Sequence, residues 1–143
     1  MNEKELQVLM DEGISGYNKI VYHFITAKDF QNAFKYADMK MEKIIDECLN
    51  MSDEDLSLIA YLYAMVGNFT SSRATLKVLY EDGDYMRDEA KLDLYGSLAA
   101  VLCHKKSGHS KKVKALLKQV LSFKPNVSHL GVDEILLAQA KEM

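Results

Sequence analysis

Three short breaks interrupt the apolar pattern of this chain at nearly equal spacing. They are residues 27–30, 66–69 and 107–110, which read AKDF, VGNF and SGHS, and successive breaks begin 39 and 41 residues apart. The segments on either side of each break show helical periodicity, so each break is expected to be the tight turn of a helical hairpin. The sequence therefore predicts one structural unit that is repeated three times.

The strongest helical signal follows the first break. From Phe30 onward, apolar residues recur at the three- and four-residue spacing of one helix face for about five turns. These residues lie at positions 30, 33, 34, 37, 41, 44, 45, 48 and 49. The same spacing precedes the break at Tyr17, Ile20, Val21 and Phe24. The first hairpin is therefore predicted over about residues 15–49.

The second and third hairpins follow the same layout. Ser52 is followed by three acidic residues, which favours the start of a helix, and Gly67 is a typical residue just beyond a helix end. Segments 56–66 and 92–103 are apolar on nearly every side, as expected of helices that neighbours cover on two sides. The remaining predicted elements are hairpins over about residues 53–80 and 90–122, a loop at 81–89, and short helices over 3–10 and about 132–142.

Length and composition fit a single all-α domain. The 143 residues are enough to enclose one hydrophobic core. One proline and seven glycines are few for a disordered chain or for a β-sandwich with many turns, and no segment shows the alternation typical of a strand. One helical domain over residues 1–143, without strands, is therefore predicted.

The second hairpin resembles a tetratricopeptide repeat, a helical hairpin with small and large apolar residues at fixed positions. The matching residues are Leu56, Ile59, Ala60, Tyr63, Gly67, Phe69, Ser72 and Leu76. In the first hairpin they are Tyr17, Ile20, Val21, Phe24, Phe30, Ala33 and Ala37. In the third they are Ser97, Ala100, Val101, His104, Gly108, Val113, Leu117 and Pro125. The resemblance covers residues 14–125 and implies three stacked hairpins in a right-handed superhelix with short terminal helices; a plain helical bundle is the alternative.

In this family the first helices of successive hairpins line a concave groove that holds a segment of another protein. The resemblance places ten residues in such a groove: Asn18, Tyr22, Ile25, Tyr61, Ala64, Met65, Tyr95, Leu98, Leu102 and Lys105. Tyrosines among aliphatic side chains suit recognition of an apolar segment. Tyr22, Tyr61, Tyr95 and Leu102 are expected to form the groove floor and to be exposed when no partner is bound. The alternative is that some of them pack against the terminal helices.

No motif in the sequence indicates catalysis, a cofactor or a metal. The nearest candidate is the group of Cys103, His104 and His109, but zinc requires four ligands and the remaining cysteine and histidines show no pairing motif. Phosphate-binding, metalloprotease and serine-hydrolase motifs are absent. The chain is therefore predicted not to be an enzyme, and both cysteines are expected to be reduced thiols.

Charge is distributed unevenly along the chain. Residues 1–55 carry a net charge of −6, residues 56–100 carry −2, and residues 101–143 carry +5. The basic residues of the last segment include Lys105, Lys106, Lys111, Lys112, Lys114 and Lys118. This run contains no arginine and no aromatic residue for base stacking, so no specific nucleic-acid binding is predicted. A solvated face is expected, and docking of an acidic partner is the alternative.

These observations predict a non-enzymatic protein-binding module that holds an apolar or helical segment of another polypeptide. Small free-standing proteins of this kind are similar to the bacterial type III secretion chaperones, which hold an aggregation-prone segment of a secreted subunit. A peptide-sensing regulator and a scaffold subunit are the alternatives, and a homodimer stays open. With no signal peptide and no apolar run of membrane-spanning length, a cytoplasmic location without a membrane span is expected.

Overall fold

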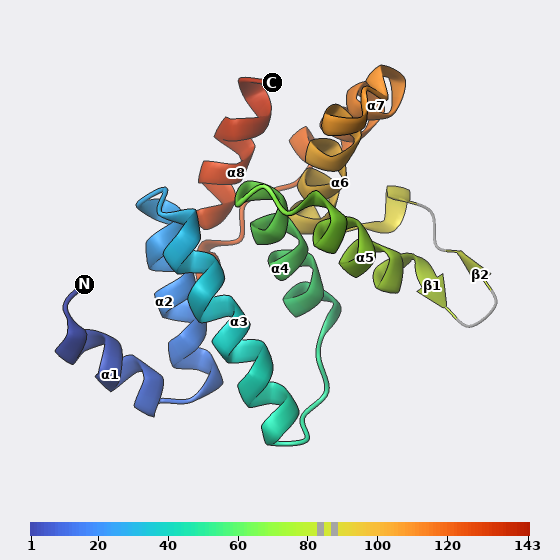
Figure 1. Ribbon diagram of the computed structural model, residues 1–143. Helices are drawn as coiled ribbons and strands as arrows, with labels where there is room; N and C mark the ends of the chain where they lie inside the picture. The colour runs from blue at the N-terminus through green and yellow to red at the C-terminus, as the bar shows by residue number, and fades with distance from the viewer. Residues whose placement is uncertain (83–84, 87–88) are drawn as a thin grey trace.

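The computed structural model describes residues 1–82, 85–86 and 89–143 (Figure 1). Its helices are α1 (Glu3–Asp11), α2 (Ile14–Thr26), α3 (Phe30–Asp46), α4 (Asp53–Met65), α5 (Phe69–Tyr80), α6 (Leu94–Ser107), α7 (Ser110–Leu121) and α8 (Val132–Lys141). Two short 3-10 turns, η1 (Glu89–Lys91) and η2 (Val127–His129), precede α6 and α8. The all-α class is therefore confirmed.

One short antiparallel pair departs from the purely helical expectation. β1 (Glu81–Asp82) pairs with β2 (Tyr85–Met86) through two residues on each side. This pair lies in the predicted loop at 81–89, of which residues 83–84 and 87–88 lie outside the described part of the chain. None of the helices in the described residues combines the length and the apolar character needed to cross a lipid bilayer.

Three pairs of sequence-adjacent helices pack most extensively: α2 with α3, α4 with α5, and α6 with α7 (Figure 1). The first helix of each pair ends in the same way. Lys28, Gly67 and Gly108 have left-handed backbones, with φ of 58°, 88° and 77°. In each case the next residue donates its backbone N–H to the carbonyl five residues earlier, at 2.8, 2.8 and 3.0 Å. This bond defines a Schellman cap, so the three breaks in the sequence are equivalent turns.

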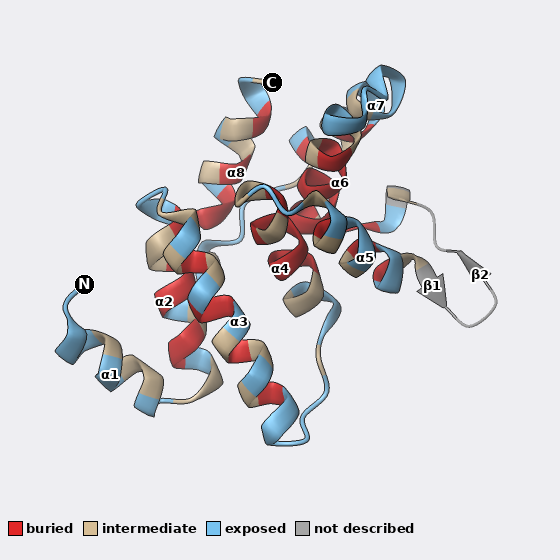
Figure 2. Cartoon of the chain, viewed as in Figure 1, coloured by how far each residue is buried: buried red, intermediate tan, exposed pale blue. Residues whose placement is uncertain are grey.

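The core is richest around α4 and α6, which pack against each other in the middle of the molecule (Figure 2). Between Ser57 and Leu62 every residue of α4 is buried, and so is every residue between Leu94 and Val101 in α6. The all-round apolar pattern of segments 56–66 and 92–103 therefore identified the two central helices. Helix α3 packs on α4, α5 packs on α6, and α8 packs on α2, α6 and α7.

A partly buried ion pair joins α3 to the start of α4. The Nζ of Lys40, which is 4% exposed, donates to a carboxylate oxygen of Asp55. Asp55 also completes a capping box with Ser52, as the sequence pattern predicted. Burial alone raises the pKa of Asp55, but the hydrogen bonds from Lys40 and Ser52 outweigh it and hold this pKa below its ordinary value. The pair therefore ties the two hairpins together at the position where α4 begins.

Helix α1 approaches α2 at Gly16. A β-carbon at this glycine would lie 1.7 Å from the carbonyl oxygen of Leu9 and 2.7 Å from its carbonyl carbon, so only glycine permits this approach. Helix α1 itself contains no buried residue. The close approach at Gly16, together with the partly buried Leu6, Leu9 and Met10, therefore holds α1 against α2.

Substitution Gly16→Ala is expected to release α1 and leave the three hairpins folded. The clash involves backbone atoms, which cannot turn aside as a side chain can, and the small area buried by α1 limits the loss of stability to about 1–2 kcal/mol. Amide hydrogen exchange within residues 3–11 should become faster, while exchange in α4 stays slow. Ser15→Ala at the exposed neighbouring position is the control. Unchanged protection of α1 would show that the helices do not approach in this way.

Candidate protein-binding surface

The structure places the ten predicted groove residues on α2, α4 and α6, and α8 lies across the same side of these helices (Figure 1). Besides Met65, three of them contact the η2–α8 segment through a ring or a hydroxyl, namely Tyr22 of α2, Tyr61 of α4 and Tyr95 of α6. We call these three residues the tyrosine surface. Six of the ten are buried: Tyr22, Ile25, Tyr61, Ala64, Tyr95 and Leu98. Asn18, Met65 and Leu102 are half-buried, and Lys105 is exposed.

The expectation that the three tyrosines are exposed in the free chain is therefore wrong, and Leu102 is only half-exposed. Tyr61 is 0% exposed and Tyr95 is 2% exposed. The physical reason is α8, which covers the tyrosine surface and removes its apolar area from water. Packing against a terminal helix was the alternative to an open groove. It describes these tyrosines correctly.

The contact between α8 and α4 is made through Gln139. The hydroxyl of Tyr61 donates to Gln139 Oε1 at 2.8 Å, and Gln139 Nε2 donates to the sulfur of Met65 at 3.3 Å. Burial raises the pKa of the Tyr61 hydroxyl, so it remains protonated and can donate. The edge of the Phe30 ring faces Tyr61 from α3, with ring centroids 6.3 Å apart. Tyr61 is thus held by an aromatic contact on one side and by α8 on the other.

The contact between α8 and α6 is a buried polar group around Asp133. The hydroxyl of Tyr95 donates to Asp133 Oδ1 at 2.7 Å, and the backbone N–H of Asn126 donates to Oδ2 at 2.7 Å. Asp133 is 4% exposed, so these bonds replace the water that its carboxylate loses. Burial, followed by the hydrogen bond to Asp133, raises the pKa of Tyr95 and keeps its hydroxyl protonated.

His129 connects this polar group to α2 and α4. Its Nδ1 lies 2.8 Å from Asp133 Oδ1, and its Nε2 lies 3.2 Å from Glu54 Oε1 at the start of α4. Its ring is 5.5 Å from the rings of both Tyr22 and Tyr95, measured between centroids. Burial, then the nearby charges of Glu54 and Asp133, raises the pKa of Tyr22. The segment leading into α8 is therefore bound to all three first helices.

Helix α8 itself is amphipathic. Val132, Leu136 and Ala140, spaced four residues apart, are buried along one face. Glu134 and Ala138 are exposed on the other face. Leu130 and Gly131, immediately before α8, both have left-handed backbones. Helix α8 therefore packs through a single apolar stripe. The chain turns sharply just before the helix begins.

The tyrosine surface offers hydrogen-bond donors and apolar area but no reactive group. In the described part of the chain, no group of three or more His, Cys, Asp or Glu side chains could hold a metal ion. Cys103 Sγ donates to Ser72 Oγ at 3.4 Å, whereas His104 lies 3.0 Å from the Glu89 carboxylate and 3.1 Å from His109. The three predicted side chains line one pocket, but within the described residues they do not form a metal-ligand group. Burial raises the pKa of the Cys103 thiol, which disfavours the nucleophilic thiolate.

Comparisons of the chain with protein-family models, with curated proteins and with solved structures found no match. Function is therefore inferred from the geometry of this chain. His129, Asp133 and Gln139 were not among the predicted site residues. The four-residue spacing of Val132 and Leu136 was the one signal that the last helix has a buried face, but it does not identify the surface that covers it.

Proposed function

We propose that the chain is a non-enzymatic protein-binding module whose tyrosine surface accepts a helical, partly apolar segment of another protein. One observation carries this proposal: the surface already holds a helix. Helix α8 is bound there through one apolar stripe and through side-chain hydrogen bonds to Tyr61 and Tyr95. A partner helix with a similar stripe and similarly placed polar groups would find the same contacts, as in other helix-in-groove complexes.

In this proposal α8 covers the tyrosine surface in the free chain, and a segment of the partner displaces it from that surface. Helix α8 packs on each single neighbouring helix less extensively than the two helices of any hairpin pack on each other. The segment between α7 and α8 is mostly exposed, and its polar and ring contacts with α2, α4 and α6 are made by His129. An occupant of this kind keeps apolar area covered until a partner arrives and thereby limits self-association.

The repeated turns support a tetratricopeptide-like arrangement of the three hairpins. The three first helices end in equivalent Schellman caps, and they present their tyrosines to one common surface. Within this proposal the protein acts as a small chaperone or adaptor, similar in kind to the type III secretion chaperones. A scaffold subunit differs in one respect, because its α8 would be a permanent part of the core.

The experiment uses a fluorescently labelled peptide of residues 127–143 as the probe. It is titrated onto the full chain carrying Leu136→Asp, in which the chain's own α8 is destabilised on its seat. We expect saturable binding to this variant and much weaker binding to the unmodified chain, because the tethered α8 competes at an effective concentration of about 1 mM.

The matched control peptide carries the Leu136→Asp change itself. It should not bind, since it lacks the central residue of the apolar stripe. Equal binding of both peptides, or no binding of either to the variant chain, would contradict the proposal that the tyrosine surface accepts a helix from another molecule.

A further inference from the structure

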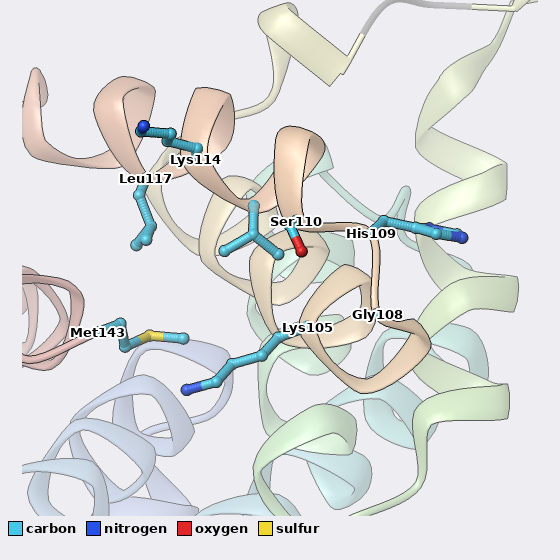
Figure 3. A pocket seen from close by; sticks show the side chains of 8 residues that line it. Lys105, Gly108, His109, Ser110, Lys114, Leu117 and Met143 are labelled. Carbon is cyan, nitrogen blue, oxygen red and sulfur yellow. The ribbon is translucent and has the colours of Figure 1, made fainter.

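A second surface lies at the turn between α6 and α7, beside the end of α8. Here a pocket of about 290 Å³ opens between the two helices and Met143 (Figure 3). Its apolar lining is formed by Val113 and Leu117, one turn apart on α7, together with Met143. All three side chains are half-buried. The volume is at the lower end for a ligand site, which suits one or two apolar side chains.

Positive charge flanks this pocket. Lys105 of α6 and Lys114 of α7 both line it and lie on opposite sides of Leu117 and Met143 (Figure 3). Four further exposed lysines follow the same two helices: Lys106, Lys111, Lys112 and Lys118. Helix α7 contains no acidic residue, and none of these six lysines forms an ion pair within the described residues.

We propose that this basic pocket binds an acidic amphipathic segment of a partner protein. An apolar side chain of the partner enters between Val113, Leu117 and Met143, and its flanking carboxylates pair with Lys105 and Lys114. The charge of the surface selects an acidic partner, because unpaired lysines attract carboxylates and repel basic segments. This site lies outside the tyrosine surface, but Met143 follows α8, so the pocket is complete only while α8 stays bound to that surface.

The side chains in and around the pocket favour a peptide over two other anionic partners, nucleic acid and a lipid surface. Single-stranded nucleic acid also stacks its bases on aromatic side chains, and α7 has none. A lipid surface is reached by apolar side chains that protrude into it. Val113 and Leu117 are instead half-buried in the pocket lining, where a protruding side chain of a peptide reaches them.

The probe is a synthetic alanine-based helical peptide that carries glutamates and two leucines placed four residues apart, and it is labelled with fluorescein. Its binding to the full chain is followed by fluorescence anisotropy near physiological salt. Lys105→Glu together with Lys114→Glu should weaken binding about tenfold or more. The control pair, Lys4→Glu with Lys35→Glu, makes the same change in net charge at exposed sites on α1 and α3 and should change it less than about twofold. Circular dichroism checks that both variants keep their helices.

A second peptide, with both leucines replaced by serine, tests the apolar part of the site without altering the protein. It should bind about tenfold or more weakly, because the pocket then stays empty. Equal binding of the two peptides, equal loss in both protein variants, or no binding at all would overturn the proposal. Tighter binding to a DNA duplex or to phosphatidylserine vesicles would overturn it too, as would salt-sensitive self-association through a second copy.

Discussion

Replacing Tyr61 with alanine is expected to lower the free energy of unfolding by about 3–5 kcal/mol, in the range found for large aromatic side chains removed from a core. The side chain is fully buried between α3 and α8. Its removal leaves a cavity beneath α8 and deprives Gln139 of its hydrogen-bond donor. A residue on the floor of an open groove would cost far less stability, because its side chain would be in water before the change.

Tyr61→Phe is the matched control, since it keeps the ring and removes only the hydroxyl. We expect it to cost about 1 kcal/mol, the usual net value of one hydrogen bond. Chemical denaturation of both variants gives the two free energies. A cost for Tyr61→Ala no larger than that for Tyr61→Phe would mean that Tyr61 faces solvent and that α8 does not cover it.

Substitution Leu136→Asp is expected to detach α8 from the tyrosine surface and to lower the free energy of unfolding by about 3 kcal/mol or more. Leu136 is fully buried at the centre of the apolar stripe. A carboxylate at this position would have no hydrogen-bond or ionic partner where α8 packs. Detachment of α8 is therefore expected to cost less free energy than burial of the charge. The uncovered surface should bind a hydrophobic dye and cause concentration-dependent self-association.

The control for this change is Ala138→Asp, which places the same charge on the exposed side of the same helix. It should leave dye binding and stability nearly unchanged. Circular dichroism of Leu136→Asp should show a loss of helix limited to α8, because the hairpins retain their own core. Unfolding of the whole chain in Leu136→Asp would show that α8 is an integral part of that core.

The helix ends could be predicted from the sequence because the residues that form a cap lie within a few positions of one another. The capping box at Ser52 and Asp55 formed as expected, and Gly67 and Gly108 adopt the left-handed backbone that ends a helix. The first turn has no glycine, yet Lys28 adopts the same conformation. This left-handed lysine costs about 1–2 kcal/mol and could not be identified from residue type.

The covering of the tyrosine surface could not be predicted for a different reason. The groove positions of Tyr22 and Tyr95 followed from the resemblance to a tetratricopeptide repeat. Their burial depends on a distant segment, since Tyr95 is 38 positions from its partner Asp133. A pattern of apolar residues shows that α8 has a face to bury. It does not show which surface receives that face.

The central claim is that α8 is a displaceable occupant of the tyrosine surface, and native-state amide hydrogen exchange tests it most directly. The free energy of opening is measured for the amides of α8, α4 and α6 as denaturant is added below the unfolding transition. We predict that the α8 amides open together at a clearly lower free energy than those of α4 and α6. Exchange of α8 only through global unfolding, at the same free energy as α4, would contradict the claim and make α8 a permanent part of the core.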